Sequence, residues 1–244
     1  MPYTVPETST KIIDSHLHIW ASPEEAAGKY PYFPGKEPPL PGSLDLLLQC
    51  MEEAEVDGAF IVQPIYHMFD HSLVTSAIKK YPSKFVGCSL ANPAEDGSGV
   101  KQLEQLVLKD GYRAVRFNPE LWPSGQKMTS EIGKALFSKA GELGIPVGFL
   151  CTKVYVKFSA LFRVSRKPYP YKDLGGPLSQ LVSAFGANRL MWGTDFPYVV
   201  AESGYKRAKE AVTLIGKLVP LSASELDLIM GKTVMELFPS QWRP

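Results

Sequence analysis

Lys11-Ile12-Ile13-Asp14-Ser15-His16-Leu17-His18 contains the first of seven short apolar runs spread along the chain. These runs are rich in residues that favour β-strands. They are followed by a loop and then by a stretch with the hydrophobic period of a helix. The alternation predicts parallel strands joined by helical crossovers. We expect strands at residues 11–13, 59–63, 84–91, 112–118, 145–151, 154–159 and 189–194. We expect helices at 44–55, 72–81, 100–108, 130–143, 177–185, 205–218 and 222–237.

Composition predicts an ordinary globular protein. The chain has 244 residues, of which 45% are apolar and 21% charged, and its net charge is +1. This length can bury a sizeable core, and we expect one domain over residues 1–244. The near-neutral charge argues against a nucleic-acid or membrane partner, and no run reaches transmembrane length. A homo-oligomer is left open.

Cysteine usage and the N-terminus favour the cytoplasm. Cys50, Cys88 and Cys151 are odd in number and widely spaced, which is typical of reduced thiols. Residues 1–10 contain neither an apolar signal core nor an arginine-rich amphipathic stretch, so we expect no targeting segment.

His16 and His18 form a candidate half-site for a metal. Side chains alternate along a strand, so residues i and i+2 point to the same side. Two neutral imidazoles can then converge on one divalent ion.

Polar residues gather where the apolar runs end. In a (β/α) barrel, the carboxyl ends of the strands build the active site. For a single residue such as Gln63 or Asn92 we favour an ordinary capping or loop role, whereas for His16, His18 and Asp195 together we favour a functional one. The set comprises His16, His18, Gln63, Asn92, Arg116, Asn118, Cys151, Ser159 and Asp195.

The motif at the last strand makes the pattern specific. Asp195 lies within Trp192-Gly193-Thr194-Asp195-Phe196-Pro197, at the mouth of that strand. Together with Asp-x-His-x-His at the first strand, it resembles the amidohydrolase superfamily. Within it, the chain is similar to the amidohydrolase-2 branch of 2-pyrone-4,6-dicarboxylate lactonase-like and aminocarboxymuconate-semialdehyde-decarboxylase-like enzymes. The resemblance extends to Val115-Arg116-Phe117-Asn118 and Tyr155-Val156-Lys157-Phe158-Ser159.

The resemblance implies a TIM-type (β/α) barrel and a role for several residues. His16 and His18 would bind a divalent metal, zinc in the first instance, or polarise the substrate in members that work without metal. Asp195 would be the third ligand and the base that takes a proton from water. Arg116 would bind a substrate carboxylate, although a rim salt bridge is the alternative. Asn118, Arg163 and Tyr198 are the further substrate-binding candidates.

His67 and His71 are four residues apart, a spacing that can chelate a metal on one helical turn. The glutamate of a zinc-protease helix is absent. In the family that the chain resembles, the matching loop contributes mainly to substrate shape. We favour His71 as a surface residue at a helix start over metal binding.

The chain departs from the family pattern after Cys151. Only Thr152 and Lys153 separate the runs 145–151 and 154–159, whereas a parallel crossover needs a dozen or more residues. The family places a strand ending in Asp-His there, and this chain has no histidine beyond His71. We hypothesise an incomplete barrel of about seven strands, which lacks one or two βα units between Cys151 and Val154.

Three functional hypotheses follow. The first is a hydrolase of small carboxylated, lactone or amide substrates. The second is a non-oxidative decarboxylase of the same superfamily. The third is a catalytically impaired, shortened isoform.

Overall fold

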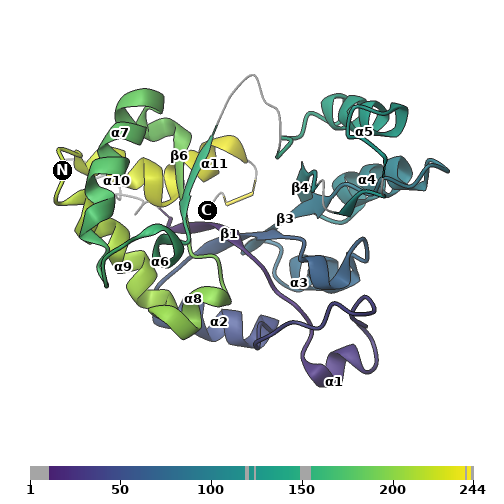
Figure 1. Ribbon diagram of the computed structural model, residues 1–244, viewed down its shortest axis with the longest axis horizontal. Coiled ribbons are helices and arrows are strands. Elements are labelled where there is room, and N and C mark those ends of the chain that lie inside the picture. Colours follow the sequence, from purple (N-terminus) through teal and green to yellow (C-terminus); the bar gives the residue numbers. More distant parts are fainter. Residues whose placement is uncertain (1–10, 119–120, 124, 149–154, 240, 243–244) are drawn as a thin grey trace, which may run out of the picture.

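The computed structural model describes residues 11–118, 121–123, 125–148, 155–239 and 241–242. Six strands alternate with helices along this part of the chain (Figure 1). They are β1 (Ile13–Leu17), β2 (Gly58–Val62), β3 (Phe85–Leu90), β4 (Tyr112–Arg116), β5 (Val156–Ser159) and β6 (Leu190–Gly193).

Helices connect the strands, and each of the longer ones buries one apolar face. In α2, for example, Leu47 and Met51 are fully buried and the Ser43 side chain accepts a hydrogen bond from the Leu46 amide. The α-helices are α1 (Pro23–Ala26), α2 (Leu44–Glu53), α3 (Ser72–Lys80), α4 (Ser98–Lys109), α5 (Glu131–Glu142), α6 (Leu161–Val164), α7 (Gly175–Phe185), α8 (Tyr198–Glu202), α9 (Tyr205–Gly216), α10 (Ala223–Asp227) and α11 (Thr233–Leu237). Short turns of other helix types are η1 (Ile65–His67), η3 (Lys172–Leu174), η4 (Ala187–Arg189) and the π-helical η5 (Leu228–Lys232).

All the strand pairs are parallel, as the sequence predicts. One sheet has the order β1-β2-β3-β4, and β5 pairs with β6. The two sheets meet because β6 lies beside β1: the Asp195 amide donates to the His16 carbonyl at 3.0 Å, and the His18 amide donates to the Phe196 carbonyl at 3.0 Å. The carboxyl ends of β1 and β6 therefore lie side by side.

The expected strand at 145–151 is found only in part. Among its described residues, Val147 alone forms an isolated parallel bridge, to Val115 of β4. Residues 149–151 of that strand, and the proposed deletion point at Cys151-Thr152-Lys153, lie outside the described residues. The strands otherwise match their predicted positions, although β1 continues through Leu17 because the polar residues of its motif remain extended. The single domain stays a prediction.

The C-terminal helices cover the amino ends of the strands. A core cluster joins strand residues such as Phe60 and Met191 to Val234, Phe238 and the C-terminal Trp242. Figure 1 shows α11 beside the strands β1 and β6. The predicted helix 222–237 is interrupted at η5, where Gly231 packs against the start of β1.

Replacing Gly231 with alanine tests that contact. A Cβ at this position would lie 2.1 Å from the Lys11 carbonyl oxygen, so the helix must move away from β1. We expect Gly231→Ala to lower the free energy of unfolding by about 3 kcal/mol, the upper end of overpacking costs. The measurement is urea unfolding followed by circular dichroism. Gly141→Ala is the matched control. Gly141 lies in α5, and outside the backbone of its own helix no atom lies within 4 Å of an added Cβ. This substitution should raise the free energy of unfolding by about 0.5–1 kcal/mol. Equal effects of the two substitutions would contradict the packing described.

Candidate functional site

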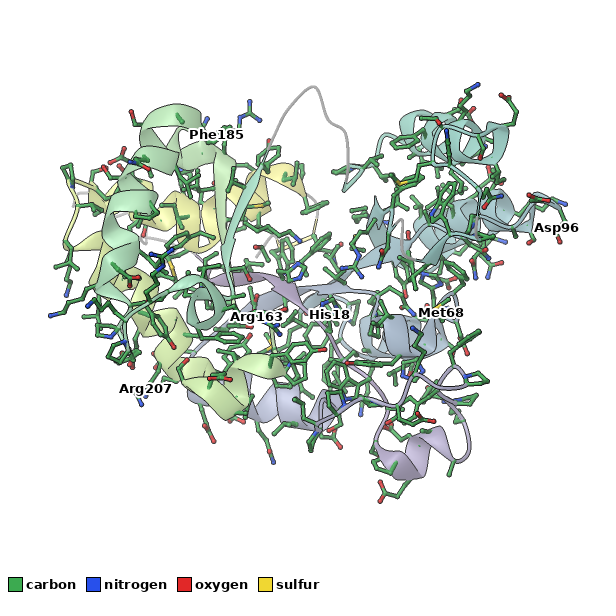
Figure 2. All side chains as sticks on the ribbon, in the orientation of Figure 1. His18, Met68, Asp96, Arg163, Phe185 and Arg207 are labelled. Atoms are coloured by element: carbon green, nitrogen blue, oxygen red, sulfur yellow. The ribbon has the colours of Figure 1, made fainter. Side chains whose placement is uncertain are left out.

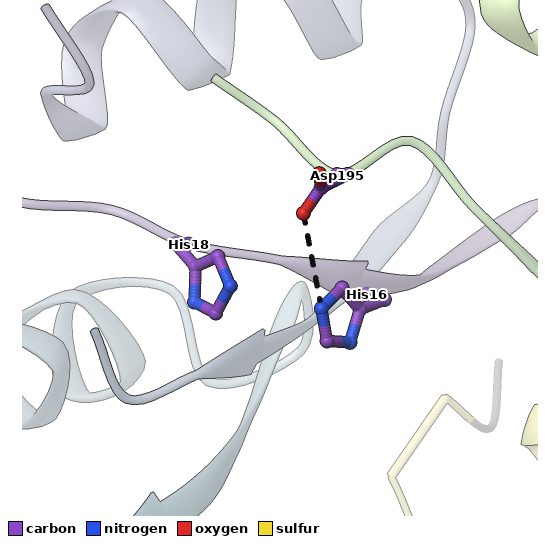
Figure 3. Close-up of side chains that lie close together, drawn as sticks. All are labelled: His16, His18 and Asp195. Atoms are coloured by element: carbon purple, nitrogen blue, oxygen red, sulfur yellow. Dashed lines mark ion pairs between the residues drawn. The ribbon is translucent and has the colours of Figure 1, made fainter. Parts of the chain in front are cut away.

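His16, His18 and Asp195 converge at the carboxyl ends of β1 and β6 (Figure 3). One ligand atom from each lies within 4.8 Å of the others. The His16 Nε2 atom is 3.9 Å from Asp195 Oδ1, and the two imidazole rings meet edge to face with centroids 5.2 Å apart. We refer to these three residues as the triad.

The second ring nitrogen of each histidine is already engaged. His18 Nδ1 lies 2.8 Å from the Val62 carbonyl oxygen, an acceptor, so Nδ1 carries the proton and Nε2 keeps its lone pair. His16 Nδ1 lies 2.8 Å from Lys157 Nζ. Burial lowers the pKa of His18 to about 3, and burial together with Lys157 holds the pKa of His16 well below its usual range. Both imidazoles are therefore neutral at pH 7. His18 offers its Nε2 lone pair, whereas an ammonium that donates to His16 Nδ1 leaves the ring proton on Nε2, the atom that faces Asp195.

Asp195 is held in a left-handed backbone conformation, with φ at 63°. A non-glycine residue in this region is strained, and such residues often occur at functional sites. Arg163 of α6, labelled in Figure 2, donates from Nε to Asp195 Oδ2 at 3.1 Å. Burial raises the pKa of Asp195, while Arg163 opposes that shift. The paired carboxylate can accept a proton from a nearby water or bind a cation.

Asp14 holds the two strands of the triad together through hydrogen bonds, a role that the sequence analysis did not predict. Its carboxylate is fully buried and accepts hydrogen bonds from the His16 amide, the Thr194 amide, the Thr194 hydroxyl and the Tyr205 hydroxyl at 3.0, 3.1, 2.5 and 2.8 Å. It thereby joins β1 to the segment that carries Asp195. Burial raises the pKa of Asp14 to about 6, and the four hydrogen bonds limit this rise.

The other substrate-binding candidates lie at different distances from the triad. The Arg163 guanidinium packs 4.6 Å from the centre of the Tyr198 ring, so both belong to the rim beside Asp195. The Tyr198 hydroxyl also meets that of Tyr66 at 2.9 Å. Arg116 donates to the Gln63 carbonyl at 3.3 Å, and its positive charge lowers the pKa of both histidines. Asn118 is half-buried and is not among the described residues that line the adjoining cavity.

His67 and His71 serve the fold. His67 accepts a hydrogen bond from the Ala21 amide at 3.2 Å, and its Nδ1 lies 3.1 Å from the Pro31 carbonyl oxygen. His71 accepts a hydrogen bond from the Leu90 amide at 3.1 Å, and its Nδ1 lies 2.9 Å from the Phe69 carbonyl oxygen. The prediction that His71 is a surface residue is wrong, since it is 4% exposed at the start of α3. Its two ring nitrogens stabilise backbone groups that burial would otherwise leave unpaired.

Lys157 is the site residue that sequence reasoning missed. It lies on β5 with its ammonium against His16, and it lines the cavity beside the triad. The available signal was a lysine between Val156 and Phe158, because a charged residue interrupts an otherwise apolar strand there.

Comparisons with known proteins agree with this geometry. The family model described as "Amidohydrolase" matches residues 13–153 and 149–239. Among solved structures, the chain is similar to a probable 2-pyrone-4,6-dicarboxylic acid hydrolase from Acinetobacter baumannii with citric acid bound, with 16% identity, 94% of this chain and 99% of that one covered, and a TM-score of 0.72.

Two further similar structures are decarboxylases. One is 2,6-dihydroxybenzoate decarboxylase from Rhizobium, with 12% identity, 94% and 99% coverage and a TM-score of 0.66. The other is 5-carboxyvanillate decarboxylase from Novosphingobium aromaticivorans in complex with manganese, with 12% identity, 97% and 98% coverage and a TM-score of 0.62. At these identities the likeness establishes the fold. No curated protein matches the chain.

We expect Asp14→Asn to destabilise the protein and displace the triad. The new amide would point an N–H group toward donors, so about 1–3 kcal/mol of unfolding free energy should be lost. Tyr205→Phe is the matched control, because it removes one of the four hydrogen bonds and should cost about 1 kcal/mol. Thermal and urea unfolding measure both. A loss in Asp14→Asn no larger than in Tyr205→Phe would contradict the anchoring role.

The buried His71 should make stability depend on pH. Burial lowers its pKa from 6.5 to about 4, so the unfolded chain binds a proton more readily between these values. Stability from His71 is therefore complete above pH 6.5 and is lost as the pH falls toward 4, by about 3 kcal/mol. Urea unfolding of wild type and His71→Gln across pH 4–7.5 isolates this contribution, and parallel pH profiles would contradict it.

Proposed function

Because the chain belongs to the amidohydrolase family, we propose that it is a hydrolase of small carboxylated, lactone or amide substrates. The convergence of His16, His18 and Asp195 within 4.8 Å carries this proposal. The likeness to a probable 2-pyrone-4,6-dicarboxylic acid hydrolase, which acts on a carboxylated substrate by its name, supports it.

The triad suits a divalent cation, and we propose zinc. Two neutral imidazoles and one carboxylate supply nitrogen and oxygen donors of the type found in catalytic zinc sites. Val62 orients the His18 ring from behind, as carbonyls commonly do for metal-binding histidines. A bound divalent cation would polarise the substrate carbonyl and lower the pKa of water.

The remaining residues have proposed catalytic or substrate-binding roles. Asp195 is the proposed general base, and Arg163 holds its carboxylate in one orientation at 3.1 Å. The planar guanidinium groups of Arg163 and Arg116 match a substrate carboxylate. Tyr198 supports Arg163 through its ring, and Asn118 completes the proposed binding residues.

Two observations favour a weak or impaired enzyme as the second candidate. His67 and His71 serve the fold, so the four histidines of the chain leave two for the site. The family model also matches in two pieces that meet at residues 149–153, where we propose that one or two βα units are missing. We expect reduced metal affinity and low turnover. The manganese-bound decarboxylase among the similar structures keeps decarboxylation as the alternative reaction.

The proposed setting is the cytoplasm, with a small-molecule substrate and no nucleic-acid partner. The near-neutral net charge and the free thiols of Cys50 and Cys88 support this. Among the described residues, no helix is both long and apolar enough to cross a membrane. A homo-oligomer stays a proposal.

Metal affinity should respond in opposite directions to two substitutions. His18→Ala removes a ligand and should weaken zinc binding at least tenfold. Lys157→Met removes a positive charge 2.8 Å from His16 and should strengthen it about tenfold, which corresponds to about 1.4 kcal/mol. Isothermal titration with zinc measures both, with exposed Lys109→Met as the control. Unchanged affinity in His18→Ala would refute the site.

A substrate comparison tests the reaction. With zinc or manganese supplied, we expect ring opening of 2-pyrone-4,6-dicarboxylate, followed by absorbance, to exceed carbon dioxide release from 2,6-dihydroxybenzoate. Asp195→Asn should lower the rate about a hundredfold or more, as expected for loss of a general base, while Asp227→Asn should leave it unchanged. Carbon dioxide release without ring opening would favour the decarboxylase. No turnover with either metal would favour the impaired isoform.

A further inference from the structure

A cavity with mostly apolar walls lies between β4 and β5, and His16 is one of the residues that line it. Its volume is about 420 Å³, within the usual range of small-molecule pockets. Pro146 and Val147 border it on the β4 side, and Tyr155 and Lys157 border it on the β5 side. It therefore occupies the interior between the two ends of the described sheet.

Much of the cavity wall is apolar. Phe60 and Met191 come from the strands, whereas Val234, Leu237 and Phe238 come from the C-terminal helix and the residue after it. Their side chains offer no hydrogen-bonding partner, so the bound group that they stabilise best is a hydrocarbon.

Two cations also line the cavity. Arg116 and Lys157 line it beside His16, and no acidic residue is found among the described lining residues. In the described part of the chain, neither Arg116 nor Lys157 forms an ion pair. The Arg116 Nε atom is buried and has no hydrogen-bond partner among the residues that the structure describes. Arg116 is half-buried and Lys157 is exposed, and two cations without a carboxylate beside them favour an anionic guest.

We propose that this cavity binds an aliphatic monocarboxylate, with its carboxylate between Arg116 and Lys157 and its tail among Phe60, Met191 and Phe238. Lys157 Nζ lies 5.5 Å from the centre of the Phe60 ring, and Phe60 stacks on Phe238, so the apolar walls begin beside the charges. Apart from Arg116 and Lys157, the described lining residues include no lysine or arginine, which favours one carboxylate over two. The site shares Arg116 with the proposed hydrolytic site, but it needs no metal, so its ligand binding is tested separately from hydrolysis.

Calorimetric titration of the wild-type chain with acetate, hexanoate, octanoate and decanoate, kept below micelle formation, tests the tail. We expect one site per chain and an affinity that rises about fourfold for each added methylene. Decylammonium, with the same tail and the opposite charge, should bind at least a hundredfold more weakly than decanoate. Affinity independent of tail length, or equal binding of decylammonium, would overturn the proposal.

Variants locate the binding. Ala114→Leu extends a side chain into the cavity and Arg116→Met removes a cation, so each should weaken decanoate at least tenfold. Arg113→Met is the matched control, because Arg113 lies on the same strand but donates to the Val107 and Tyr112 carbonyls. His18 does not line the cavity among the described residues, so His18→Ala should keep decanoate binding while losing zinc. Decanoate affinity unchanged in both Ala114→Leu and Arg116→Met would place the ligand elsewhere and overturn the proposal.

Discussion

The buried Asp14 carboxylate is the contact on which the rest of the site depends. Four donors from β1, from the residue after β6 and from α9 surround it, and a charge without them would be costly in that environment. Because β1 and β6 lie far apart in the sequence, this contact fixes the register between His16 and Asp195. The 3.9 Å distance between His16 Nε2 and Asp195 Oδ1 depends on this register.

Positive charge dominates the surroundings of the triad. Lys157 contacts His16, Arg163 contacts Asp195, and Arg116 is close enough to lower the pKa of both histidines. A divalent cation must bind against this field, whereas a carboxylate is attracted by it. The same three residues therefore weaken a metal and favour an anionic substrate, which agrees with the low metal affinity that we propose for a shortened barrel.

The sequence predicts the parallel α/β fold, most element positions and the pairing of His16 and His18 with Asp195, because these depend on local pattern and on the common edge of parallel strands. It does not predict contacts set by packing between distant segments. Asp14 reads as part of a motif, and its four partners include Tyr205, nearly two hundred residues away. His71 reads as a polar helix start, yet its ring satisfies backbone groups inside the core. Lys157 lies within an apolar strand, and its position beside His16 depends on how β5 meets the rest of the sheet.

X-ray absorption at the zinc edge tests the central claim most directly, namely that His16, His18 and Asp195 form one metal site. For the zinc-loaded chain we predict a first shell of nitrogen and oxygen only, with the multiple-scattering signature of two imidazoles. That signature should fall to one imidazole in His18→Ala. A sulfur-containing shell, or an imidazole count unchanged by that substitution, would contradict the account.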